Sequence, residues 1–154
     1  MKLKLIVLSV LKRMGFFSLI KYYTRQQIRI LCYHGIWLGR EGYEGDSMFM
    51  QQSTFAHRLE CIKKWNFPVI SLDQAAKEYK NGTLPACSVV ITIDDGWYSI
   101  YSAMLPLLRK YNMPATLYCD TAHLITRQPV PHIMANYFNI LSELGYLGGS
   151  CNNK

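Results

Sequence analysis

Two adjacent carboxylates and a glycine follow an apolar, β-branched run in this 154-residue chain. The run extends from Ser88 to Ile93 and is continued by Asp94, Asp95 and Gly96. Carboxylates can accept a proton or bind a cation, and α/β proteins place their active sites at the carboxyl ends of parallel strands. Asp94 and Asp95 are therefore candidates for a functional site. The alternative is an ordinary turn, which Asp and Gly favour for local backbone reasons, and on these residues alone we favour the turn.

The histidines and cysteines do not form a metal-binding pattern by their spacing. The four histidines are His34, His57, His123 and His132, and no two of them are one helical turn apart. The five cysteines are widely spaced and lack a Cys-x-x-Cys pair, so they indicate neither a disulfide framework nor a thiolate zinc site. We expect a reducing compartment, in which Cys32 and Cys119 act as small core residues.

Alternating strands and helices are predicted to position the acids. Strands are predicted over 28–34, 68–72, 88–93 and 114–119, and helices over 53–65, 71–82, 100–111 and 133–144. The first of these helices has an apolar stripe made of Phe55, Leu59, Ile62 and Trp65, with Ser53 as a possible cap. The second begins with a Ser-x-x-Gln capping box at Ser71, and Pro106 must either start the third helix or kink it. Because 88–93 is nearly all Val and Ile, we expect a parallel strand buried on both faces.

Residues 1–25 form a basic and apolar leader. Lys and Arg total 17 against 10 Asp and Glu, and much of the excess precedes the first acid, Glu41. The composition from Leu3 to Tyr23 predicts a helix that either lies on an anionic membrane surface or packs on the domain. Its apolar run is too short to span a bilayer and lacks a small-x-small cleavage site, so we expect a cytoplasmic or peripheral membrane protein rather than a secreted one. Elsewhere no basic groove is interleaved with aromatic residues, which argues against nucleic acid as a partner.

The segment Thr92-Ile93-Asp94-Asp95-Gly96 resembles the first motif of the polysaccharide deacetylases, the NodB-homology domain, in which a strand ends in Asp-Asp-Gly. The likeness continues to Pro114-Ala115-Thr116, begins at Leu31-Cys32-Tyr33-His34-Gly35, and covers roughly residues 28 to 125. The family fold is a distorted (β/α) barrel. The resemblance therefore implies that residues 26–154 form a partial α/β barrel, truncated after about four strands, behind the leader of residues 1–25.

The resemblance also implies an activity, the hydrolysis of N-acetyl or similar acyl groups from an amino sugar or polysaccharide with a divalent metal, zinc by preference. Asp94 would be the general base and Asp95 a metal ligand. His34 and Trp97 would lie on the substrate side, where Trp97 could stack on a sugar; a core histidine and a ring that covers the domain edge are the alternatives.

The family's pair of histidine ligands is absent from this sequence, so we expect the short chain to be inactive alone. His123 lies beyond the fourth predicted strand and could bind a metal only if its loop folds back, and a solvated side chain is the stronger interpretation. A second hypothesis is a non-catalytic peripheral membrane or carbohydrate-binding module, in which the acids form only a turn.

Overall fold

The computed structural model describes residues 2–39 and 48–128. The chain divides into two compact units, residues 1–118 and 119–154. The described part of the second unit contains a short helix, α6 (Thr121–Thr126), which the sequence pattern did not predict. The predicted helix over 133–144 and His132 lie outside the described residues. The predicted boundary after residue 25 stays a prediction.

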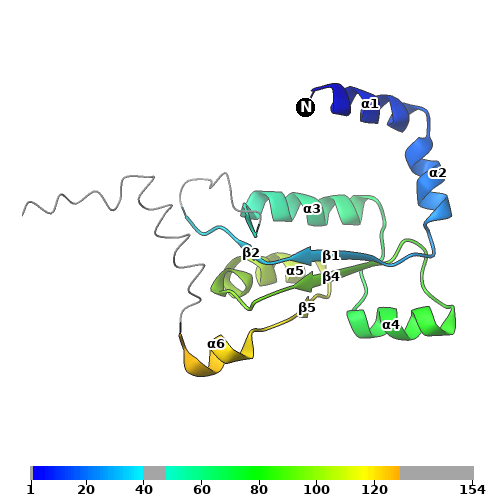
Figure 1. Cartoon of the computed structure of the whole chain (residues 1–154). Coiled ribbons are helices and arrows are strands. Elements are labelled where there is room, and N and C mark those ends of the chain that lie inside the picture. The colour runs from blue at the N-terminus through cyan, green and yellow to red at the C-terminus, as the bar shows by residue number, and fades with distance from the viewer. Residues whose placement is uncertain (1, 40–47, 129–154) are drawn as a thin grey trace, which may run out of the picture. The chain divides into compact units, whose positions relative to one another are not determined.

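A three-stranded parallel sheet organises the first unit (Figure 1). Its central strand, β4 (Val89–Ile93), is the predicted β-branched run, and all its residues are buried. On one edge β4 pairs along its whole length with β1 (Arg29–Tyr33), and on the other its last two residues pair with β5 (Thr116–Leu117). The mixed α/β class is confirmed, and over the described residues the strands form an open sheet, so the partial barrel stays a prediction.

Two predicted strands are shorter in the structure than in the sequence analysis. The segment 68–72 contributes only a bridge between Val69 and Val89, with the Ile70 amide donating to the Val89 carbonyl at 3.0 Å. The strand predicted over 114–119 is reduced to β5. Because β1 occupies one edge of β4, the bridge and β5 share the other edge, and neither can extend along all of it.

The two faces of β4 belong to separate parts of the core. Val89, Ile91 and Ile93 pack in a large cluster with α3 (Gln52–Lys64) and α5 (Leu105–Tyr111). The intervening Val90 packs in a smaller cluster with α4 (Leu72–Asn81), on the opposite face of the sheet (Figure 1). Successive strand side chains point to opposite faces, so a strand made only of branched apolar residues suits a position between two helical layers.

The helix α4 begins and ends as its sequence predicts. The Ser71 Oγ accepts a hydrogen bond from the Gln74 amide at 3.2 Å, which satisfies one of the free donors of the first turn. The Gln74 side chain donates to Glu78 at 2.9 Å instead of completing the capping box. Gly82 closes the helix in the left-handed conformation, with φ of 67°.

Two details predicted for α3 are wrong. The helix starts at Gln52, after the extended residue Gln51, so Ser53 lies inside the first turn and does not cap it. Phe55 and Leu59 are fully buried as expected, but Trp65 is 56% exposed. The helix ends at Lys64, so Trp65 lies beyond it and is not held on its buried face. The Trp65 ring instead lies beside the ring of Phe67.

The segment before α5 is a π-helical turn, η1 (Ile100–Met104), and Pro106 lies in the first turn of α5. The prediction that Pro106 starts or kinks a helix is therefore confirmed as a helix start. Proline has no amide hydrogen to donate to the preceding turn, so an α-helical ladder cannot pass through it unchanged. Ile100, Met104 and Leu108 form the buried side of this helical segment.

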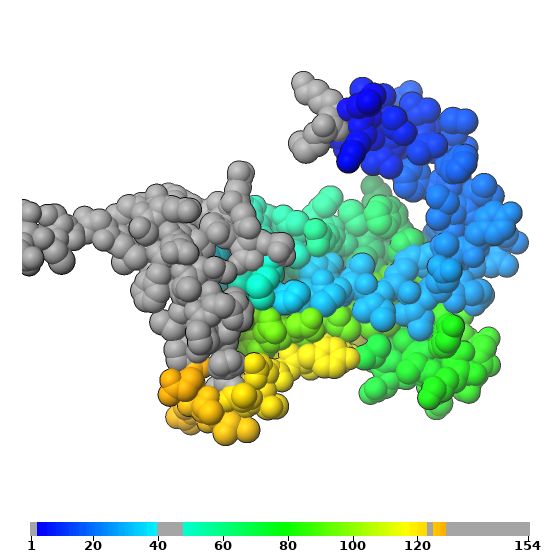
Figure 2. All heavy atoms as spheres, in the orientation of Figure 1, coloured from blue at the N-terminus to red at the C-terminus, as the bar shows by residue number. Residues whose placement is uncertain are grey.

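The leader forms two helices rather than the single helix predicted from Leu3 to Tyr23. These are α1 (Lys2–Arg13) and α2 (Phe16–Tyr23), separated by Gly15 in the left-handed conformation with φ of 77°. A right-handed helix cannot continue through a residue with positive φ, which glycine adopts readily. No residue of α2 is buried, and Figure 2 shows both helices, in blue, at the surface. None of the described helices is long and apolar enough to cross a membrane.

Candidate functional site

The pairing of β1 with β4 brings Asp94 beside His34. In this register Tyr33 lies opposite Ile93, and the Asp94 amide donates to the Tyr33 carbonyl at 2.9 Å, which extends the ladder by one step. The His34 Nε2 lies 3.9 Å from the Asp94 Oδ2, and their side chains are 36% and 33% exposed. The expectation that His34 lines the same edge of the sheet as the acids is therefore confirmed in position. Its role on the substrate side stays a prediction.

Cys32 completes this group, although the sequence analysis assigned it to the core. Cys32 is two residues before His34 on β1, so both side chains lie on the same face of the strand. Its thiol donates to the Asp94 Oδ2 at 3.1 Å. That hydrogen bond raises the pKa of the Cys32 thiol, because it stabilises the protonated form. Partial desolvation of the thiol raises the pKa further, to a smaller extent.

The core assignment of Cys32 is wrong because this face of β1 is open. Cys32 is exposed, and its neighbour on the same face, Ile30, is 55% exposed. Cys119, the other cysteine assigned to the core, is also exposed. The signal that could have identified Cys32 is its spacing, since a Cys-x-His pair at the end of a strand places two potential ligands on one face.

Asp95 faces in another direction. It has a left-handed backbone, with φ of 71°, and Gly96 follows with φ of 74°. The Gly96 amide donates to the Asp94 carbonyl at 3.0 Å, and the Asp95 Oδ2 accepts a hydrogen bond from the Trp97 Nε1 at 3.2 Å. Asp and Gly tolerate this conformation better than most residues. The segment is thus a tight turn, as one hypothesis proposed, and this turn aims its two carboxylates at different partners.

Trp97 and Phe49 form a small aromatic wall beside the turn. The Trp97 ring lies 5.7 Å from the ring of Phe49 on β3 (Phe49–Met50), which pairs with β2 (Gly35–Ile36). A Cβ on Gly35 would lie only 2.7 Å from the nearest ring carbon of Phe49, so the close approach requires glycine. Trp97 is partly buried and packs against the main core, and its stacking on a sugar stays a prediction.

A buried serine anchors the wall. Ser99 is 4% exposed, and its Oγ accepts a hydrogen bond from the Ile36 amide at 3.1 Å. This contact ties β2 to the start of η1 over a long sequence separation. The sequence analysis did not identify Ser99 as a structural residue, because a serine in a polar segment gives no sign of a distant partner.

Among the other histidines, His57 lies on a different element from the group, on α3, with a side chain that is 76% exposed. His123 belongs to α6 in the second unit, and its side chain lies outside the described residues, as does all of His132. Over residues 2–39 and 48–128, Cys32, His34 and Asp94 each offer an atom within 4.8 Å of the others.

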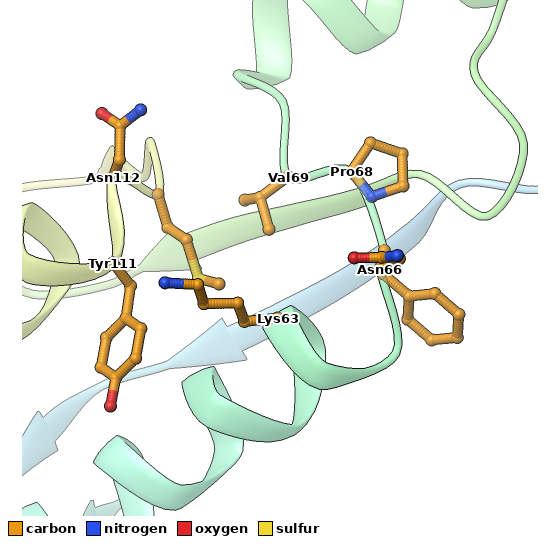
Figure 3. Close-up of a pocket in the computed structure, with 8 residues that line it drawn as sticks. Lys63, Asn66, Pro68, Val69, Tyr111 and Asn112 are labelled. Carbon is orange, nitrogen blue, oxygen red and sulfur yellow. The ribbon is translucent and has the colours of Figure 1, made fainter.

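A separate cleft of about 330 Å³ lies between the end of α3 and the end of α5 (Figure 3). Lys63 and Asn66 from the end of α3 line it, together with Tyr111 and Asn112 from the end of α5. Its remaining wall includes Val69, which bridges to the first residue of β4, whereas Asp94 follows the last. The cleft is therefore remote from the carboxylates.

The turn lies inside a segment with recognisable relatives. Residues 81–140 match the family model for polysaccharide deacetylase. The chain resembles polysaccharide deacetylases. The matched segment of this deacetylase-like chain includes β4, the Asp94-Asp95-Gly96 turn and β5, which are the elements that the sequence resemblance emphasised.

Curated relatives match a similar length of the chain. The poly-beta-1,6-N-acetyl-D-glucosamine N-deacetylase of Staphylococcus aureus is 32% identical over 74 residues, which is 48% of this chain and 26% of that protein. The enzyme of the same name from Escherichia coli is 30% identical over 82 residues, which is 51% of this chain and 12% of that protein. The match thus spans about a quarter or less of each relative.

Solved structures of deacetylases share the fold of the described region. A de-N-acetylase from Aggregatibacter actinomycetemcomitans superposes with a TM-score of 0.58 and 25% identity, covering 68% of this chain and 42% of that one. The Streptococcus pyogenes deacetylase PplD in complex with acetate superposes with a TM-score of 0.53 and 28% identity, covering 58% of this chain and 41% of that one. The deacetylase-like chain therefore spans less than half of either structure.

Proposed function

We propose that the Asp94-Asp95-Gly96 turn is the base-bearing part of an N-deacetylase site that acts on an N-acetylated amino sugar or its polymer. The observation that supports this most directly is the position of Asp94, which is fixed at the carboxyl end of a buried parallel strand inside the segment that matches deacetylases. The relatives named as N-deacetylases of a glucosamine polymer support the substrate class. Acetate, present in one of the similar structures, is the acid that hydrolysis of an acetamide releases.

In this proposal the two carboxylates have separate roles. Asp94 is 33% exposed, so water can reach its carboxylate, which takes the proton from the attacking water. His34, at 3.9 Å, lies close enough to help orient that carboxylate. The Asp95 Oδ2 accepts a hydrogen bond from the Trp97 indole, and in this proposal the Asp95 carboxylate binds the cation. A bound divalent metal would polarise the amide carbonyl and lower the pKa of water.

The donor set of the described residues is incomplete for this role. A catalytic zinc ion usually has three protein ligands, and Asp95 supplies one. The sequence has no pair of histidines one helical turn apart. We therefore propose that the 154-residue chain binds the sugar but does not release acetate above the spontaneous background.

Sugar binding and acetate release test this proposal separately. The chain is titrated calorimetrically with oligomers of β-1,6-linked N-acetylglucosamine, and acetate is measured in the same samples. We expect saturable binding that is lost in Trp97→Ala and kept in Trp65→Ala, a matched change at an exposed tryptophan. Equal binding by both variants would place the sugar elsewhere. Acetate release above the background would contradict the proposed inactivity of this chain, and release that then survived Asp94→Asn would exclude Asp94 as the base.

We also propose that α1 and α2 attach the protein to an anionic membrane surface. Most of their large apolar side chains are exposed, including Leu3 at 75%, Tyr23 at 75% and Phe16 at 48%. Their charged residues are all basic, and the first acid in the sequence is Glu41. This combination suits the boundary between lipid headgroups and acyl chains, where each basic residue adds about 1 kcal/mol.

Vesicle sedimentation tests the membrane proposal. We expect the chain to bind vesicles that contain phosphatidylserine and not vesicles of phosphatidylcholine alone, and deletion of residues 1–25 should abolish binding. Reversing two charges, Lys12→Glu and Arg13→Glu, should weaken binding by at least about 25-fold, since each basic residue contributes about 1 kcal/mol. Unchanged binding after the deletion would refute the proposal.

A further inference from the structure

The ends of β1 and β4 bring together three different metal-binding groups. Cys32 presents a thiol from β1, His34 presents an imidazole from the residue after β1, and Asp94 presents a carboxylate from the residue after β4. One donor atom of each lies within 4.8 Å of the other two. Thiolate, imidazole and carboxylate are the three side-chain ligands of protein-bound zinc.

Two of the three separations are close to those of a tetrahedral site. With ordinary zinc–ligand lengths, a sulfur and an oxygen on one ion lie about 3.6 Å apart, and a nitrogen and an oxygen about 3.4 Å. Here the Cys32 Sγ lies 3.1 Å from the Asp94 Oδ2, and the His34 Nε2 lies 3.9 Å from the same oxygen. Each of these two distances differs from the ideal value by about 0.5 Å, and a small side-chain rotation can remove this difference.

Strand pairing and core packing hold the backbone beneath these groups in place. Each residue of β1 is in register with β4, from Arg29 opposite Val89 to Tyr33 opposite Ile93. Tyr33 and Ile93 are 3% and 2% exposed, so the strands directly below the donors are anchored in the core. The donors themselves remain partly exposed, which leaves room for a water molecule as the fourth ligand.

We propose that Cys32, His34 and Asp94 bind one zinc-class divalent cation. This site shares Asp94 and His34 with the proposed deacetylase centre but uses Asp94 as a ligand rather than as the base, and it needs neither Asp95 nor paired histidines. The ion replaces the hydrogen that the Cys32 thiol shares with Asp94, so one proton leaves the protein and no electron is transferred. An ion at this position occupies the oxygen of Asp94 that a base would use.

A second thiol and imidazole on α3 provide an internal control. The Cys61 Sγ lies 3.6 Å from the His57 Nε2, and Glu60 lies 4.0 Å from the other ring nitrogen, Nδ1. Because the thiol and the carboxylate face opposite nitrogens of one ring, these three groups cannot converge on one ion. This α3 group has the same residue types as the proposed site but lacks its geometry.

Cobalt titration of the whole chain tests the proposal, because a cobalt–thiolate bond gives a near-ultraviolet charge-transfer band. The titration uses a phosphine reductant, and zinc competition then gives the affinity. We expect one ion per chain, with the band lost in Cys32→Ser and kept in Cys61→Ser. His34→Gln and Asp94→Asn should weaken binding by at least about 10-fold to 100-fold, since loss of an outer partner already has that effect.

Two results would overturn the proposal. One is a band that persists in Cys32→Ser and disappears in Cys61→Ser, and the other is a zinc affinity that none of the three site variants changes. Circular dichroism melts establish that the variants fold, and substitution is compatible with folding because all three side chains are at least partly exposed. The titration contains no sugar, so its failure leaves the deacetylase proposal intact, and loss of sugar binding leaves the zinc site intact.

Discussion

The approach of β2 to β3 makes Gly35→Ala a sensitive test of the wall beside the carboxylates. The added Cβ would lie 2.7 and 2.9 Å from two ring carbons of Phe49 and 3.0 Å from the Ser99 Oγ. Carbon atoms pack best at about 3.5–4.0 Å, so the Phe49 ring must move by about 1 Å. That ring contacts Trp97, and Ser99 accepts the Ile36 amide, so both contacts are disturbed together.

We expect Gly35→Ala to lower the free energy of unfolding by about 1–3 kcal/mol, the usual range for overpacking. For a chain of this size about 2 kcal/mol corresponds to a fall in Tm of about 4–8 °C. Urea denaturation followed by circular dichroism measures the change. The control is Gly35→Ala in a Phe49→Leu background, where the ring is absent and the cost should fall below about 1 kcal/mol. An equal cost in both backgrounds would show that the loss does not arise from this contact.

Three further outcomes follow from the described contacts. Ile91→Ala removes a fully buried side chain from the main core and should cost about 2–5 kcal/mol in urea denaturation, and a loss below about 1 kcal/mol would contradict its burial. Ser71→Ala removes the hydroxyl that caps α4 through the Gln74 amide and should cost about 1 kcal/mol, whereas Ser71→Asp should restore most of it. Zinc at about 100 times its Kd should raise the free energy of unfolding by about 2.7 kcal/mol, and the same increase in Cys32→Ser would contradict the assignment of the thiol as a ligand.

Local patterns predicted the parts of the structure that depend on neighbouring residues. The buried strand β4, the cap at Ser71 and the left-handed end at Gly82 each follow from a few adjacent residue types, and each is observed. The position of His34 at the same edge as Asp94 combines two local strand patterns with the parallel pairing of β1 and β4, because parallel strands place their carboxyl ends at one edge.

The features that were missed depend on distant pairing. The lengths of β5 and of the 68–72 strand depend on their sharing one edge of β4, which no local pattern expresses. The exposure of Cys32 depends on an uncovered face of β1. The separate directions of Asp94 and Asp95 arise from a positive φ at Asp95 as well as at Gly96, and the residue types of the turn do not specify these directions.

The register between β1 and β4 has a consequence for the order of folding. Arg29 pairs with Val89 across a long intervening segment that includes α3 and α4. Closing a flexible loop of about 60 residues costs on the order of 4 kcal/mol of chain entropy before any contact offsets it. Local helices therefore form early and this strand pairing forms late. Cys32 and His34 belong to the segment before the loop, and Asp94 belongs to the segment after it. Metal uptake in a refolding experiment would therefore report the pairing of the two strands rather than the initial collapse.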